Sequence, residues 1–385
     1  MTPSQQGPED KTRHDLINPM LEQAGWVVQH FKSASPYAAK GVAVEYFPMG
    51  IGVGEADYVL FIDGQACGIL EAKKEGETLI AKEPQSNKYA QGFPQDFQHV
   101  GLPLPFVYES SGSETRFTNK WDPKPRSREL FHFHTPETLA EWIKQRQETL
   151  RKRLLEIPEI DNPLLWPVQR KAIENLEESL CAARPRALIQ MATGSGKTFT
   201  AVNMCYRLIK HTNAKRILFL VDRSNLGVQT LQEFENFVVP KDGRKFTDLY
   251  NVQHLQSNVI DDVSRVCIST IQRVYSMLKG EKQLDPLAEE HSGFESDYSL
   301  EPAPVEYNPA IPITMFDVII IDECHRSIYN LWKQHYGQAA RPDIGSHHPV
   351  VPIFSGGSAC RASARSRLSE SLSRPGKFLC GCRRR

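Results

Sequence analysis

The sequence lacks any uninterrupted apolar run of about 18 residues, the length that predicts a membrane-spanning helix. The first fifteen residues are polar, so the apolar middle region of a signal peptide is missing as well. The sequence therefore shows neither the pattern of a membrane protein nor that of a secreted precursor. We expect a cytoplasmic protein of the bacterial type with no membrane partner.

The sequence also lacks the cysteine spacing of a disulfide framework and an excess of either charge. Its eight cysteines are scattered, and Cys380 and Cys382 form a C-x-C pair with no second pair to complete a zinc site. Basic and acidic residues number 46 each, so no overall field draws the protein to nucleic acid. Nucleic-acid binding must therefore use local patches. The length of 385 residues predicts two or three domains.

What the sequence does contain is a glycine-bearing loop at residues 186–198. The short apolar run 187–189 predicts a buried strand before it. The stretch 199–209 predicts a helix after it, which Lys197 and Thr198 open. A strand, a glycine loop and a helix N-terminus together form a cradle whose backbone N–H groups hold phosphates.

Each residue type in this loop has a role in holding ATP and Mg²⁺. Glycines let the backbone approach the phosphates, the lysine reaches the β- and γ-phosphates, and the threonine hydroxyl holds Mg²⁺. Met191 replaces the first glycine of the strict motif, which is typical of helicase-type motors. A chance glycine turn is the less favoured alternative. The predicted ATP-binding residues of the loop are Thr193, Gly194, Ser195, Gly196, Lys197 and Thr198.

Three further apolar runs predict that the loop belongs to a parallel sheet. They cover residues 217–221, 266–270 and 316–321 and alternate with helical stretches. Asp322 ends the last run and is predicted to bind Mg²⁺ opposite the threonine of the loop. Glu323 would orient or deprotonate the attacking water. A simple solvated strand end is the alternative for this Asp-Glu pair.

Gln169 begins the helix that precedes the loop. A glutamine in this place can read the edge of an adenine with both halves of its amide. A polar residue that merely starts the helix is an equally supported interpretation.

A second candidate site lies near the N-terminus. Residues 11–26 predict a short amphipathic helix that stops at a glycine. Two apolar runs follow, at 56–62 and 66–73, and Asp63-Gly64 between them is a hairpin signal. We therefore expect two antiparallel strands joined by a tight turn.

The register of this hairpin decides which side chains meet. A plain two-residue loop pairs Asp57 with Leu70 and puts Glu71 on the opposite face. One extra loop residue, or a bulge, pairs Asp57 with Glu71 instead. Alternate strand residues share a face, so Asp57, Glu71 and Lys73 would then lie together.

Two carboxylates and a lysine on one face form a hard-oxygen Mg²⁺ site with a cation beside the attacking water. This Asp…Glu-x-Lys arrangement is that of restriction-type nucleases. Gln85 and Tyr89 are four residues apart behind a proline, so they are predicted to share a helix face. Their spacing resembles the RecB-like branch of that superfamily. The alternative is that Glu71 and Lys73 are a solvated strand end.

Two other segments concern the organisation of the chain. Residues 136–156 predict one charged helix with Thr135 as N-cap and Pro136 in the first position. A solvated helix that joins two domains is favoured over a DNA contact. Residues 279–311 hold eight acidic and two basic residues and predict a surface insertion.

The segment that most specifically resembles a known family is Asp322-Glu-Cys-His325, which is similar to the Asp-Glu-x-His box of superfamily 2 helicases. With the two hairpin strands and residues 114–119 (Glu-Thr-Arg-Phe-Thr-Asn), the chain to about Gln334 resembles the R subunit of type I restriction enzymes. That subunit combines motor and nuclease.

The resemblance implies that Asp57, Glu71 and Lys73 cut double-stranded DNA, and that Gln85 and Tyr89 support the cut. It further implies an ATP-driven DNA translocase that uses Lys197, Thr198, Asp322, Glu323 and His325. Arg223 and Thr270 correspond to positions that touch the DNA backbone. The implied partners are methylation (M) and specificity (S) subunits, and the DNA recognition sequence belongs to another subunit.

The expected fold is α/β. A RecB-like PD-(D/E)xK nuclease domain is expected over 1–120, a helical linker over 121–160 and a RecA-like ATP-binding helicase lobe over 161–340. Residues 341–385 hold eight arginines and one lysine against two acids, which departs from the family. We expect this segment to be a disordered tail of a truncated chain, whose deletion leaves ATP binding nearly unchanged.

Other functions compete with this one. The chain could be a non-catalytic remnant that binds ATP and DNA, because the arginine of a second motor lobe is not recognisable and fast ATP hydrolysis needs one. A standalone superfamily 2 helicase is the third possibility, which the hairpin carboxylates argue against.

Overall fold

The computed structural model describes residues 8–50, 52–75, 79, 89–146, 148–184, 186–285, 287–290, 307–322 and 350–355. The chain divides into two compact units. The first, called the N-terminal unit, comprises residues up to Lys152 and a return segment at 309–314. The second, called the C-terminal unit, begins at Arg153.

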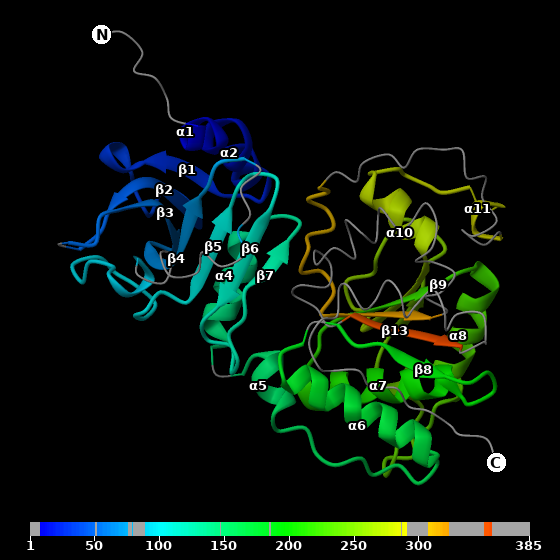
Figure 1. The fold of residues 1–385 in the computed structure, drawn as a ribbon. Coiled ribbons are helices and arrows are strands. Elements are labelled where there is room, and N and C mark those ends of the chain that lie inside the picture. The colour runs from blue at the N-terminus through cyan, green and yellow to red at the C-terminus, as the bar shows by residue number, and fades with distance from the viewer. Residues whose placement is uncertain are drawn as a thin grey trace, which may run out of the picture. The chain divides into compact units, whose positions relative to one another are not determined.

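The N-terminal unit is built on a seven-stranded mixed sheet in which strands pair in chain order (Figure 1). Its strands are β1 (Val27–His30), β2 (Gly41–Pro48), β3 (Glu55–Ile62), β4 (Gln65–Ala72), β5 (Phe106–Ser110), β6 (Thr115–Asn119) and β7 (Arg128–Leu130). The pairs β1–β2 and β4–β5 are parallel and the other neighbours are antiparallel. Because most strands pair with the next one along the chain, local turn signals decide much of this sheet.

Apolar side chains cover both faces of this sheet. One cluster joins Tyr58 and Leu70 of the sheet to Ile17 and Leu21 of the first helices and to Leu139. The helices on this side are α1 (Pro8–Thr12), the π-helical turn η1 (Arg13–Ile17), α2 (Asn18–Gln23) and α4 (Pro136–Lys144). A 3-10 turn, η2 (Phe31–Ser33), follows β1. The opposite face carries a second cluster that includes Phe47, Val59 and Phe93.

Two expectations about this region need correction. The first domain does not end at residue 120, because β7 and α4 complete the N-terminal unit. The single helix expected over 136–156 is broken into α4 and α5 (Leu150–Leu154). The start was right: Thr135 caps α4 by accepting the Thr138 N–H at 3.3 Å. The linker thus shortens, because the apolar face of α4 packs onto the sheet.

The C-terminal unit holds a six-stranded sheet in the order β10-β11-β9-β12-β13-β8, with every pair parallel. Its strands are β8 (Ile189–Met191), β9 (Ile217–Val221), β10 (Val252–His254), β11 (Val266–Thr270), β12 (Val318–Asp322) and β13 (Val350–Ser355). Its helices are α6 (Pro167–Cys181), α7 (Lys197–Thr212), α8 (Ser224–Asn236), α9 (Phe246–Leu249), α10 (Ile271–Leu278) and α11 (Leu287–Glu290). The predicted parallel sheet with alternating helices is confirmed.

Strand β13 contradicts the prediction that residues 341–385 lie outside the fold. It pairs with β12 on one side and with β8 on the other (Figure 1). The segment Val-Val-Pro-Ile-Phe is a continuous apolar run, as parallel strands often are, although a proline within it is unusual for a central strand. The arginine-rich composition around it concealed that pattern. Residues 341–349 and 356–385 lie outside the described residues.

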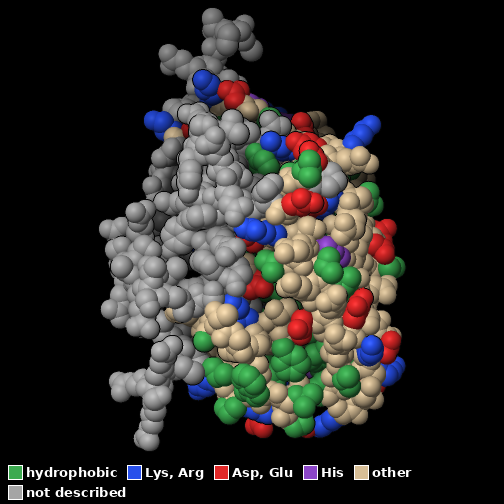
Figure 2. Space-filling model, turned by 90° about the vertical axis from the view of Figure 1, so that its right-hand side faces the viewer, with side chains coloured by type: hydrophobic (Ala, Val, Ile, Leu, Met, Phe, Trp, Pro, Cys, Tyr) green, Lys and Arg blue, Asp and Glu red, His purple; other side chains and the backbone are tan. Residues whose placement is uncertain are grey.

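The described helices include none long and apolar enough to cross a membrane. On the face seen in Figure 2, basic and acidic side chains are interspersed among the described residues. No broad field of one sign appears on that face, in keeping with the balanced composition.

Candidate functional site

The glycine loop of the C-terminal unit contains two glycines in the left-handed region of backbone conformation. Gly194 and Gly196 have φ of +76° and +72°, a region that side chains disfavour. Gly196 is the N-cap of α7, which begins at Lys197 as predicted. The strand before the loop is β8, two residues later than expected, and Leu188 is 39% exposed. The loop therefore has the strand–turn–helix geometry of a phosphate cradle.

Gln169 braces this loop from the start of α6. Its Oε1 accepts the Trp166 N–H and its Nε2 donates to the Ser195 carbonyl, both at 2.9 Å. The side chain is buried, and a Cβ added at Gly196 would lie 2.4 Å from its Nε2. Both halves of the amide are thus engaged within the chain, which favours the helix-start interpretation. Contact with adenine stays a prediction.

The carboxyl end of β12 lies at the same edge of the sheet as this loop. Asp322 pairs with Ile353 of β13, and Ile353 in turn pairs with Ile189 of β8. The last residue of β12 is therefore separated from the loop-bearing strand by one intervening strand. The predictions for Glu323 and His325 fall outside the described residues.

The two predicted DNA contacts occupy different environments. Arg223 is the N-cap residue of α8 and is partly exposed, with its Nε 3.7 Å from Asp222 Oδ2. Thr270 is buried as the N-cap of α10, and its hydroxyl donates to Glu289 Oε1 at 2.5 Å. Arg273 also pairs with Glu289. A DNA contact at Thr270 stays a prediction, and it would require Glu289 to move.

In the N-terminal unit, the β3–β4 hairpin contains the bulge that decides the register. Asp63 and Gly64 form the turn at φ of +47° and +78°, as the two-residue signal predicts. The extra residue of the bulge is Cys67. The pairs that flank the bulge are Leu60 with Gly68 and Phe61 with Ala66. The bulged register, rather than the plain one, is confirmed.

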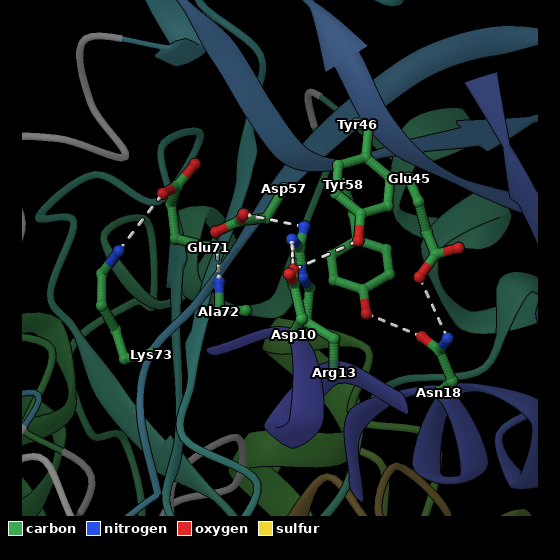
Figure 3. Close-up of polar contacts among 10 residues, drawn as sticks. All are labelled: Asp10, Arg13, Asn18, Glu45, Tyr46, Asp57, Tyr58, Glu71, Ala72 and Lys73. Atoms are coloured by element: carbon green, nitrogen blue, oxygen red, sulfur yellow. Dashed lines mark hydrogen bonds and ion pairs between the residues drawn. The ribbon is translucent and has the colours of Figure 1, made fainter. Parts of the chain in front are cut away.

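This register brings the two predicted carboxylates together. Tyr58 pairs with Leu70, so Asp57 and Glu71 are the next positions on the two strands. Asp57 Oδ2 accepts the Ala72 N–H at 2.9 Å, across the same two strands. Lys73 Nζ lies 3.5 Å from Glu71 Oε2. Figure 3 shows both carboxyl groups between Lys73 on one side and a second basic residue, Arg13, on the other.

The electrostatics of Glu71 set this pair apart. Its side chain is only 3% exposed. Burial and the neighbouring Asp57 carboxylate raise the pKa of Glu71 to about 8, although Lys73 opposes the shift. Glu71 Oε1 is buried and accepts no hydrogen bond within the described part of the chain. A buried carboxylate oxygen without a donor is one that a cation would satisfy.

The residues present fit a magnesium ion. Mg²⁺ prefers oxygen ligands and is held by one or two carboxylates, with waters completing its shell. Asp57 and Glu71 supply that donor set. Among the described residues no group of three or more His, Cys, Asp and Glu side chains gathers as a metal cage.

Of the two remaining residues predicted for the nuclease site, the structure describes only one. Tyr89 is buried in the cluster with Val59 and Phe93, on the face of the sheet opposite α2 and α4. Gln85 lies outside the described residues, so a shared helix face stays a prediction.

Sequence reasoning missed two charged residues beside this site. Arg13 donates to Asp57 from a helical turn distant in sequence. Glu109 of β5 is buried and in register with Glu71 of the parallel neighbour β4. No local signal joins them to the hairpin, although Glu109 is an acidic residue that directly follows the aromatic and apolar residues Phe106, Val107 and Tyr108.

Each of the two units contains a segment that matches a known protein family. Residues 25–116 match the family model "Type I restriction enzyme EcoKI endonuclease subunit second domain". Residues 163–341 match "Type III restriction enzyme, res subunit". The EcoKI endonuclease subunit of Escherichia coli K12 is 28% identical over 366 residues, which cover 83% of this chain and 29% of that protein. The chain is a homologue of type I restriction endonuclease subunits.

Other relatives agree with this. The SauCOLORF180P endonuclease subunit of Staphylococcus aureus COL is 26% identical over 300 residues, covering 74% of the chain and 29% of the relative. The chain thus spans under a third of the length of these restriction subunits. A solved fragment described as an HsdR subunit of a type I restriction enzyme from Vibrio vulnificus YJ016 covers 94% of the chain and 57% of the fragment at 18% identity. Its TM-score is 0.32.

Proposed function

We propose that the chain supplies the DNA-cleaving domain and the first ATP-binding motor lobe of a type I restriction enzyme. The observation that carries this proposal is the bulged hairpin, whose register sets Asp57 beside Glu71, with Lys73 directly after the end of β4. The homology to type I restriction endonuclease subunits supports the same reading.

In the N-terminal unit, Asp57 and Glu71 would hold Mg²⁺. The ion would polarise the phosphodiester and lower the pKa of an attacking water. Lys73, next to Glu71, would place a positive charge beside the developing negative charge of the phosphate. The PD-(D/E)xK nuclease fold belongs to this proposal.

In the C-terminal unit, the backbone of residues 193–196 and the N-terminus of α7 would bind the phosphates of ATP. Lys197 would neutralise the β- and γ-phosphates, and Thr198 and Asp322 would hold the accompanying Mg²⁺. Double-stranded DNA, the M and S subunits and DNA translocation are part of the same proposal, carried over from the relatives.

DNA cleavage tests the nuclease part. Plasmid DNA would be incubated with the chain, Mg²⁺ and, in a second series, ATP together with M and S subunits. We expect Mg²⁺-dependent cleavage that Asp57→Asn, Glu71→Gln and Lys73→Ala each abolish. Glu75→Gln is the matched control, because it changes an exposed carboxylate just beyond the strand. Equal cleavage by wild type and Asp57→Asn in both series would refute the assignment.

A further inference from the structure

An arginine that the nuclease pattern does not contain reaches the Asp57 carboxylate. Arg13 Nη1 donates to Asp57 Oδ1 at 3.0 Å. The other oxygen, Oδ2, accepts the Ala72 N–H at 2.9 Å. The Asp57 carboxylate is therefore held at both oxygens, by a guanidinium from η1 and by a backbone amide at the end of β4 (Figure 3).

Arg13 is itself held in one orientation. Its guanidinium carbon lies 4.1 Å from the centre of the Tyr46 ring, so the planar group rests against that ring. Its Nη2 pairs with Asp10, and the Tyr46 hydroxyl also donates to Asp10, at 3.2 Å. The Arg13 side chain is only 7% exposed. Ring, aspartate and burial together restrict the direction in which Nη1 can point.

The two carboxylates of the site thus each have a basic partner. Lys73 accompanies Glu71 from the first position after β4, and Arg13 accompanies Asp57 from a helical turn. Only the first pair belongs to the Asp…Glu-x-Lys pattern. Groups that hydrogen-bond to metal ligands orient them, and their loss weakens metal binding.

We propose that Arg13 is a positioning residue that orients the Asp57 carboxylate so that Asp57 and Glu71 face one divalent cation. The inference rests on the proposed nuclease function. Lysine cannot replace Arg13, because an ammonium has neither the flat face that lies on Tyr46 nor the fork that spans Asp10 and Asp57.

Metal titration tests this without requiring cleavage. Mn²⁺, which stands in for Mg²⁺ and is counted by electron paramagnetic resonance, is added to the whole chain without nucleotide or DNA. Arg13→Lys keeps the charge, and we expect it to weaken Mn²⁺ binding by about 10- to 100-fold. Lys11→Gln is the matched control, because Lys11 is exposed on the helical segment next to Arg13, and its affinity should be unchanged.

A second variant tests the inference in case Arg13→Lys does not fold. Asp10→Asn loosens Arg13 without touching Asp57, so it should weaken Mn²⁺ binding in the same direction but less. Thermal unfolding shows whether each variant is folded. A folded Arg13→Lys that binds Mn²⁺ as tightly as wild type, or more tightly, overturns the inference. If Arg13→Lys does not fold, unchanged affinity in Asp10→Asn overturns it.

Asp57→Asn separates this inference from the proposed function. If Asp57→Asn binds Mn²⁺ like wild type, the metal site at Asp57 does not exist, and the nuclease assignment fails together with the role of Arg13. If Asp57→Asn loses Mn²⁺ and a folded Arg13→Lys does not, the metal site stands and only the role of Arg13 is refuted.

Discussion

The carboxylate site and the nucleotide loop depend on contacts of very different range along the chain. Asp57 and Glu71 lie on the two strands of one hairpin and Lys73 directly follows the second, so a turn and a single bulged residue bring them together. The nucleotide loop is local in sequence, but the strand that bears it, β8, is joined to its sheet by β13 alone among the described strands. The first site therefore depends on local register, whereas the second depends on a strand far along the chain.

Removal of β13 should have the largest effect, and that effect should be confined to the C-terminal unit. A chain ending at residue 349 loses the strand between β12 and β8, and we expect the C-terminal unit to lose on the order of 5 kcal/mol or more, comparable to the whole stability of a domain. ATP binding should disappear. The N-terminal unit, whose described strands pair among themselves, should keep its own thermal transition in calorimetry.

A chain ending at residue 355 is the matched control, because it removes the remaining residues and keeps β13. It should bind ATP nearly as wild type does. Equal ATP affinity in the two shortened chains would show that β13 does not hold β8 in its sheet. The prediction that residues 341–385 lie outside the fold would then stand.

Loss of the lysine of the loop should abolish tight nucleotide binding without affecting the carboxylate site. Lys197→Ala removes the cation of the cradle, which we expect to cost roughly 2–4 kcal/mol of binding free energy, or about 30- to 1000-fold in affinity. Lys171→Ala changes an exposed lysine on the neighbouring helix α6 and serves as the control. Calorimetric titration with ATP–Mg²⁺ gives both affinities. Identical binding by the two variants would be incompatible with the assignment of the loop.

The carboxylate site should make the stability of the folded protein depend on pH. The pKa of Glu71 is raised to about 8 from its ordinary value near 4.5, so the folded state binds a proton that the unfolded state has released. Stability from this group is complete below pH 4.5 and is lost as pH rises towards and through 8. Glu71→Gln does not titrate, so in the absence of divalent metal it should gain stability relative to wild type over this range.

The expected gain is on the order of a few kcal/mol, measured by urea unfolding in chelator between pH 4 and 9. Glu75→Gln, at an exposed position, is the control. A Glu71→Gln curve that runs parallel to wild type throughout the range would mean that Glu71 is not a desolvated carboxylate.

The smallest effect is expected at Gln169, which ties α6 to the loop. Gln169→Ala removes two hydrogen bonds, to the Trp166 N–H and the Ser195 carbonyl, at a cost of about 1–2 kcal/mol in stability. ATP affinity should fall only modestly, because the backbone cradle remains. A loss as large as that of Lys197→Ala would indicate that Gln169 contacts the nucleotide directly.

The same difference in range explains how much the sequence could predict. The turn at Asp63-Gly64 and the helix start at Lys197 have local signals, and both were found. Even the bulge could be proposed, since only that register puts Asp57 beside Glu71. Strand β13 could not be, because parallel neighbours are chosen by distant pairing, and Pro352 within the run argues against a central strand.

Partners from distant segments were equally inaccessible to local patterns. Gln169 offered two interpretations, and its contacts with Trp166 and Ser195 favour the helix-start interpretation. Arg13 looked like one of several charges on an amphipathic helix, because nothing in its neighbourhood indicates that η1 lies against the start of β3.

The two-carboxylate metal site that we propose for the bulged hairpin can be tested by anomalous X-ray scattering from crystals of the chain soaked in Mn²⁺. The expected result is a peak bound by one oxygen of Asp57 and one of Glu71, at about 2.0–2.2 Å from each. The same peak should be missing in Asp57→Asn crystals. A peak that touches only one of the two carboxylates, or none at either when the metal is saturating, would contradict it.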